Sequence, residues 1–65
     1  MRMGRKAIGR TFEVLSFIHV KGKKVPIHSK VVCSDYNEKE REYLVIYEGS
    51  YGYTKGLFLR LVKED

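Results

Sequence analysis

Four stretches of this chain alternate apolar and polar side chains with a period of two, the pattern of β-strands with one buried face. They are residues 11–20, 25–34, 43–48 and 56–63. In the first stretch, Ser16 puts a small polar group on the apolar parity, which indicates either a bend or close packing. In the last stretch, leucines occupy alternate positions, which favours a strand over a helix.

Turn-forming residues separate these stretches. Residues 21–24 contain Gly22, which tolerates a positive φ, and they predict a hairpin turn. Residues 35–38 hold Asp and Asn, whose side chains bond nearby backbone, so a turn is expected there, with at most one helical turn over 38–42. Residues 49–53 (Gly-Ser-Tyr-Gly-Tyr) predict a glycine-and-tyrosine loop.

These elements predict an all-β fold, a small antiparallel SH3-like or OB-like barrel of four to five strands. Closure into a barrel protects edges that a flat sheet of this size would expose. Residues 1–10 are basic, contain two glycines and carry few side chains for a core, so they predict a basic extended arm. We therefore expect one domain over residues 11–65 that survives removal of the arm.

The length and composition exclude several classes. With 65 residues the chain has no room for a second domain, and it buries only about 60% of its unfolded surface. No apolar run approaches the roughly 18 residues of a membrane helix. The single cysteine, Cys33, cannot form an internal disulfide, and we expect it to be buried as a small hydrophobe. The spacing of His19, His28 and Cys33 matches no zinc motif, and no catalytic constellation is visible, so we expect no enzyme, cofactor or metal.

Charge is distributed unevenly along the chain. The net charge is +5, but residues 1–30 hold eight Lys or Arg against Glu13 alone, a net charge of +7, whereas residues 31–65 carry −2. Such asymmetry is typical of a protein that meets a polyanion with one end or face. The sequence also lacks Gln and Trp and has one Asn, a composition that favours a thermophilic source.

Lysine, arginine and exposed tyrosine are the residue types that neutralise phosphates and stack on bases. For Tyr43 and Tyr47 we expect core positions, whereas a loop tip at Tyr51 and Tyr53 suits either packing or binding. The candidate nucleic-acid-binding residues are Arg2, Arg5, Lys6, Arg10, Lys21, Lys23, Lys24, Lys30, Tyr51, Tyr53 and Lys55.

The chain, and especially its head over residues 3–11 (Met-Gly-Arg-Lys-Ala-Ile-Gly-Arg-Thr), resembles small archaeal ribosomal proteins of the large subunit. Its size and composition also resemble archaeal chromatin proteins with SH3-like barrels. The ribosomal resemblance implies a basic arm against rRNA phosphates, neighbouring ribosomal proteins as partners and a cytoplasmic location on the ribosome. The acidic second half departs from that pattern and implies that residues 35–48 face solvent or a basic neighbour.

The sequence thus predicts a structural rRNA-binding protein whose arm and first hairpin turn neutralise phosphates. Two alternatives stay open: a sequence-neutral binder of duplex DNA in chromatin, and a small adaptor whose sheet edge pairs with a partner strand.

Overall fold

The computed structural model describes residues 2–62, which form antiparallel strands and two single turns of 3-10 helix. The all-β prediction is confirmed, with seven short strands in place of the four to five expected. The elements are η1 (Gly4–Ala7), β1 (Thr11–Val14), β2 (Ile18–Val20), β3 (Lys23–Val25), β4 (Lys30–Asn37), β5 (Glu42–Tyr47), β6 (Ser50–Lys55), η2 (Gly56–Phe58) and β7 (Leu59–Leu61).

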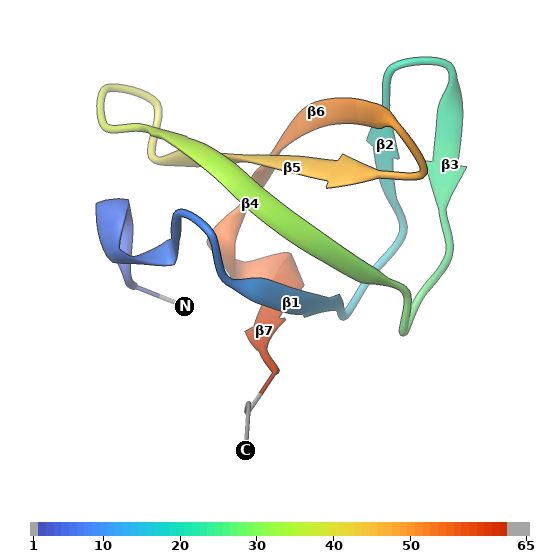
Figure 1. The fold of residues 1–65 in the computed structure, drawn as a ribbon, viewed down its shortest axis with the longest axis horizontal. Coiled ribbons are helices and arrows are strands. Elements are labelled where there is room, and N and C mark those ends of the chain that lie inside the picture. Colours follow the sequence, from blue (N-terminus) through green and yellow to red (C-terminus); the bar gives the residue numbers. More distant parts are fainter. Residues whose placement is uncertain (1, 63–65) are drawn as a thin grey trace.

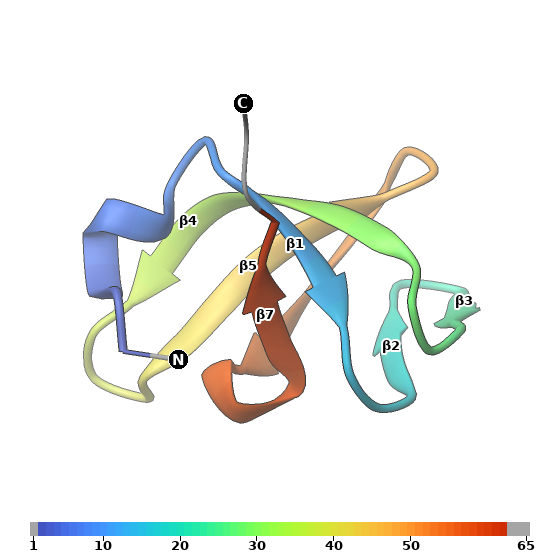
Figure 2. The ribbon, with the colours of Figure 1, turned by 90° about the horizontal axis from the view of Figure 1, so that it is seen from below.

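Five of the strands form one sheet in the order β6-β5-β4-β1-β7, and β2 pairs with β3 in a separate hairpin. Strands β4, β5 and β6 follow one another as antiparallel hairpins. The turn η2 then reverses the chain so that β7 returns beside β1, the first strand of the sheet (Figures 1 and 2). A bulge between Cys33 and Asp35 shifts the register of β4 and lets this long strand bend across the molecule.

The β2–β3 hairpin packs against β6. The amide of Lys21 donates to the carbonyl of Tyr51 at 3.0 Å. At Gly52 a Cβ atom would lie 2.8 Å from the carbonyl oxygen of His19 and 2.9 Å from the Cα of Val20, so this close approach requires glycine. The hairpin turn predicted at residues 21–24 is confirmed, and Gly22 adopts a φ of +76° there.

The core lies between the sheet and this hairpin. It is formed by the side chains that point inward from alternate positions of the strands. Cys33 is fully buried as predicted, and loss of solvation raises the pKa of its thiol. Tyr43 is buried as expected, and Tyr47 packs at the margin of the core. The largest fully buried side chains are those of Phe12, Val14, Val25, Val31, Val45 and Cys33.

The first two predicted strands differ from those observed. Residues 11–20 form two strands, with Ser16 in the bend between them. Residues 26–29 form a turn in which His28 has a φ of +74°, and they bond to the end of β1: the amide of His28 donates to the carbonyl of Val14, and the amide of Val14 donates to the carbonyl of Ser29. Strand β4 then continues through residues 35–37, where a turn was expected, because the bulge restores its pairing with β5.

The last two predicted elements also shift. The loop expected at residues 49–53 is a tight turn at Glu48 and Gly49, both with positive φ, and β6 begins at Ser50. Two positive φ values match the twist of a two-residue hairpin. Of the strand expected at 56–63, the first three residues form η2 and only 59–61 pair in β7, while Lys63 lies outside the described residues.

The extended arm predicted for residues 1–10 is wrong over residues 2–10; residue 1 lies outside the described part. This segment contains η1, and Ala7 is completely buried in the core. The amide of Gly9 donates to the backbone carbonyl of Cys33 at 2.8 Å, and the amide of Cys33 donates to the backbone carbonyl of Arg10 at 3.0 Å. These two bonds hold the segment against β4. A small apolar side chain and two paired amides suffice to fold it back, so removing residues 1–10 should destabilise the fold rather than spare it.

Candidate nucleic-acid interface

The predicted binding residues do not share one surface. The N-terminal segment and the β2–β3 hairpin lie at opposite ends of the longest dimension of the molecule, which measures 31 Å (Figures 1 and 2). Arg2, Arg5 and Lys6 therefore lie far from the lysines of the hairpin. The N-terminal segment and the first hairpin turn, both predicted to neutralise phosphates, thus lie at different ends of the molecule (Figure 1).

At the hairpin end, the lysines are exposed and spread along one turn. Lys21 and Lys24 are exposed, whereas Lys23 is engaged by Glu48. Its ammonium lies 3.5 Å from the Glu48 carboxylate and donates to the Glu48 carbonyl at 3.1 Å. This end therefore offers the charge of Lys21 and Lys24 to a polyanion.

Lys30 lies beside a second group of charges on β1 and β7. With Glu13 and Arg60 it lines a shallow hollow of about 340 Å³. The Glu13 carboxylate pairs with the Arg60 guanidinium and, at 2.6 Å, with Nδ1 of His28. These two partners, Arg60 first, lower the pKa of Glu13 from 4.5 to about 2, so this carboxylate stays ionised from neutral pH well into the acidic range.

Tyr51, Tyr53 and Lys55 form an exposed row along β6. The two tyrosines are 57% and 48% exposed, although they stand in a strand and not at the predicted loop tip. Alternation along the strand puts all three side chains on its outer face. Across the sheet, Tyr51 is the register partner of Ile46, which is 40% exposed, so the row borders an apolar patch on the outer face.

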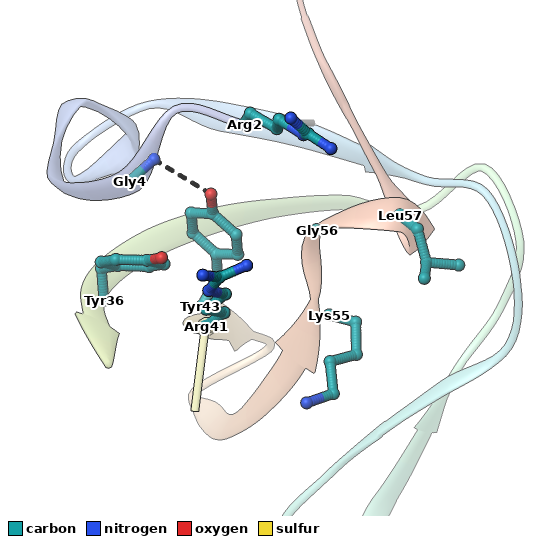
Figure 3. A pocket seen from close by; sticks show the side chains of 8 residues that line it. All are labelled: Arg2, Gly4, Tyr36, Arg41, Tyr43, Lys55, Gly56 and Leu57. Carbon is teal, nitrogen blue, oxygen red and sulfur yellow. Dashed lines mark hydrogen bonds between the residues drawn. The ribbon is translucent and has the colours of Figure 1, made fainter. Parts of the chain in front are cut away.

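The row ends at a cleft of about 510 Å³, shown in Figure 3. Three cationic side chains from separate segments line it: Arg2 from the N-terminal segment, Arg41 from the turn between β4 and β5, and Lys55 from the end of β6. The remaining lining residues within 2–62 are Gly4, Tyr36, Tyr43, Gly56 and Leu57, so none of the described carboxylates lines the cleft. We refer to this site as the cationic cleft.

Two tyrosines connect the walls of the cationic cleft. Tyr43 is only 3% exposed, and its hydroxyl accepts a hydrogen bond from the amide of Gly4 at 3.0 Å (Figure 3). The ring of Tyr36 packs on that of Tyr43 with centroids 4.7 Å apart and a tilt of 43°. The pair therefore holds the N-terminal segment, and with it Arg2, over the ends of β4 and β5.

The cations of the cleft differ in how they are held. The Lys55 ammonium donates to the carbonyl of Glu40 at 3.3 Å and lies 3.5 Å from the Glu42 carboxylate, so it is oriented and partly neutralised. Within residues 2–62, neither Arg2 nor Arg41 forms an ion pair. Arg41 also has a φ of +56°, a backbone conformation that non-glycine residues rarely adopt and that is often found at functional sites.

The other predicted cations near this end lie outside the cleft. Arg5 pairs with Glu38 at 2.8 Å on the surface, and Lys6 is exposed. Arg10 is half-buried where the N-terminal segment joins β1.

Arg41, Tyr36 and Tyr43 were not among the residues predicted to bind. Arg41 follows Glu38, Lys39 and Glu40, and in sequence its charge looks balanced by these acids. Its position in the sequence, next to a glutamate at the end of a turn, does not indicate that its side chain lines the same cleft as Arg2. The positive φ that turns it toward the cleft is a property of the folded turn alone.

Among residues 2–62, no group of three or more His, Cys, Asp or Glu side chains could hold a metal ion. In the same part of the chain, no helix has the length and apolar character needed to cross a membrane. No protein-family model, curated protein or solved structure matches the chain.

Proposed function

We propose that this protein is a non-enzymatic RNA-binding protein with a structural role, a component of the large subunit of an archaeal ribosome. The observation that carries the proposal is the continuity of an exposed tyrosine row on β6 with the cationic cleft at its end. Ribosomal assignment, a cytoplasmic location and contact with neighbouring ribosomal proteins rest on the resemblance of the chain in size, charge and basic head.

The proposed mechanism combines stacking with charge neutralisation. Tyr51 and Tyr53 are two residues apart, about 6.7 Å along a strand, and both present a ring to solvent. Unpaired bases stack on such rings, and lysine and arginine neutralise the phosphates that connect them. A single strand or an open loop suits this row better than a closed duplex, whose bases are already stacked.

For the fold we propose an SH3-like barrel rather than an OB-like one. The meander β4-β5-β6, the single 3-10 turn η2 and the return of β7 beside β1 support this type. Closure is supported by a backbone hydrogen bond outside the main sheet, from the amide of Lys21 to the carbonyl of Tyr51 at 3.0 Å, which joins the β2–β3 hairpin to β6.

Duplex DNA is the second candidate, favoured by one observation. Val32 and Ile46 are register partners on the outer face of the sheet, and they are 43% and 40% exposed. Exposed aliphatic side chains on a sheet can wedge between base steps of a duplex.

The test is fluorescence anisotropy with a single-stranded RNA of about ten nucleotides, the same RNA as a duplex, and duplex DNA. We expect single-stranded RNA to bind tightest, and Tyr51→Leu and Tyr53→Leu each to weaken it by about tenfold, since one stacked base contributes about 1–3 kcal/mol. Phe17→Leu is the matched control, because Phe17 is a 65% exposed aromatic residue in the bend between β1 and β2 and does not belong to the row.

A preference for duplex DNA would favour the chromatin alternative. Equal losses in the control would remove the tyrosine row from the mechanism, and failure to bind any nucleic acid would favour the adaptor. The ribosomal assignment has its own test, sedimentation of the tagged chain from its native lysate. Migration with large subunits that RNase abolishes supports it, and release by DNase alone contradicts it.

A further inference from the structure

We propose that the cationic cleft binds the terminal phosphomonoester of an RNA chain, and so recognises a chain end rather than an internal phosphate. This proposal rests on the proposed function, because the terminal phosphate belongs to the RNA strand that is proposed to stack on the tyrosine row. It assigns the cleft a ligand that the tyrosine row does not need, because stacking on β6 is the same for an end and for the middle of a strand.

The first argument is charge. The Lys55 ammonium is partly neutralised by Glu42, which leaves the guanidiniums of Arg2 and Arg41 in a cleft that no carboxylate of the described part of the chain lines. A phosphomonoester carries about −1.5 to −2 charges at neutral pH, whereas a phosphodiester within a chain carries one. Two guanidiniums match the dianion, and each offers the planar pair of donors that fits phosphate oxygens.

The second argument is the shape of the site. A strand that follows Tyr51 and Tyr53 along β6 reaches Lys55 and then the cleft. There the N-terminal segment crosses its path, held by the hydrogen bond between Gly4 and Tyr43 (Figure 3). A volume of about 510 Å³ lies within the range of pockets that enclose small ligands, about 300–1,000 Å³, so a terminal nucleotide fits where a continuing chain meets a wall.

The third argument is the backbone of Arg41. Its φ of +56° lies in the left-handed region, where glycine or asparagine is preferred at the end of a turn. An arginine in that conformation is a local cost to folding that a glycine would remove. From that position the side chain of Arg41 lines the cleft (Figure 3). A strained backbone that places a cation in a cleft is typical of a binding site.

The experiment compares three forms of one oligouridylate of about ten nucleotides: with a 5′-phosphate, with a 3′-phosphate, and with hydroxyls at both ends. We expect one phosphorylated end to improve binding by about tenfold, the effect of one charge-assisted contact to phosphate. Arg2→Gln and Arg41→Gln should each abolish that preference, so that the phosphorylated and hydroxyl forms bind each variant equally. Lys39→Gln is the matched control, since it removes one charge from an exposed side chain of the same turn that does not line the cleft.

Arg41→Gly keeps the test decisive if Arg41→Gln folds poorly, because glycine adopts the observed φ without strain. Equal binding of all three oligonucleotides by the natural protein would overturn the proposal, as would loss of the preference in Lys39→Gln. Binding of free uridine monophosphate as tight as that of the phosphorylated oligonucleotide would overturn the RNA-end assignment in favour of a mononucleotide. Tyr51→Leu separates the two proposals, because it should weaken all three oligonucleotides alike and leave the preference for a phosphate intact.

Discussion

Two hollows of the protein contain cations, and they differ in one carboxylate. Within residues 2–62, the lining of the cationic cleft holds Arg2, Arg41 and Lys55 and no acid, whereas the hollow between β1 and β7 holds Lys30 and Arg60 around Glu13. Glu13 is ionised at neutral pH and pairs with Arg60, so it offsets one of the two cations of the second hollow. The comparison teaches that the number of cations in a surface hollow does not by itself set its attraction for an anion, because an acid on the same wall offsets part of their charge.

The largest expected effect comes from breaking the support of the cationic cleft. Ala7 is fully buried, so Ala7→Asp places a carboxylate in the core. We expect a loss of about 3 kcal/mol in the free energy of unfolding, with Arg2 displaced from the cleft. Chemical denaturation measures the loss. Ile8→Asp is the control, because Ile8 is 40% exposed and the same acid there should cost little. Similar losses in both variants would contradict the packing of this segment against the core.

The next effect comes from removing the acid of the second hollow. Glu13→Gln leaves Arg60 and Lys30 without a carboxylate partner in that hollow and makes it resemble the cationic cleft. We expect tighter binding of single-stranded RNA and a salt dependence steeper by roughly 0.7 for each added phosphate contact. Anisotropy titrations at several salt concentrations provide the measurement. An unchanged slope would show that the hollow gains no phosphate contact when the Glu13 carboxylate is removed.

A smaller effect concerns the pH dependence of folding. The folded-state pKa of Glu13 is about 2 and its ordinary value is 4.5, so its ion pairs stabilise the fold fully above pH 4.5. As the pH falls from 4.5 toward 2, the unfolded state takes up the proton first and this stabilisation is lost. Denaturation curves across that range should show the natural protein converging on Glu13→Gln. Parallel curves at every pH would contradict the pairing of Glu13 with Arg60 and His28.

The smallest effect is expected from the surface pair of Arg5 and Glu38. Both side chains are 66% exposed, and an ion pair in that setting contributes less than about 1 kcal/mol. Arg5→Gln should therefore change the melting temperature little and leave the preference for a phosphorylated end intact. A loss of that preference would move Arg5 into the binding site and extend the cleft along η1.

Much of the fold could be predicted from the sequence because alternation along a strand is local. The parity of Phe12 and Val14, and the core position expected for Tyr43, identified the buried faces of two strands without knowledge of their partners. The strand ends at residues 15–17 and 26–29 could not be predicted in the same way. They depend on hydrogen bonds between Val14 and the segment at 28–29, which the hydrophobic pattern does not encode.

The residues of the candidate site show the same distinction between what is local in the sequence and what depends on tertiary contacts. Arg2, Tyr51, Tyr53 and Lys55 were predicted from residue type, but two of them were placed in a loop instead of a strand. Arg41 was missed because its sequence neighbours are acidic, while its partners in the cleft come from residue 2 and residue 55. The predicted arm failed because one alanine and two amides fold it onto β4.

The sequence by itself determined the all-β class, the buried parity of the strands, the turn at Gly22 and the overall positive charge. Each of these follows from side-chain chemistry at neighbouring positions. Only the tertiary structure decided which cations line the same cleft. Arg2, Arg41 and Lys55 converge because the bond from Gly4 to Tyr43 and the order of the strands bring three distant segments together, whereas the hairpin lysines end at the far side of the molecule. Electrostatic attraction depends on distances in space, and the fold sets those distances.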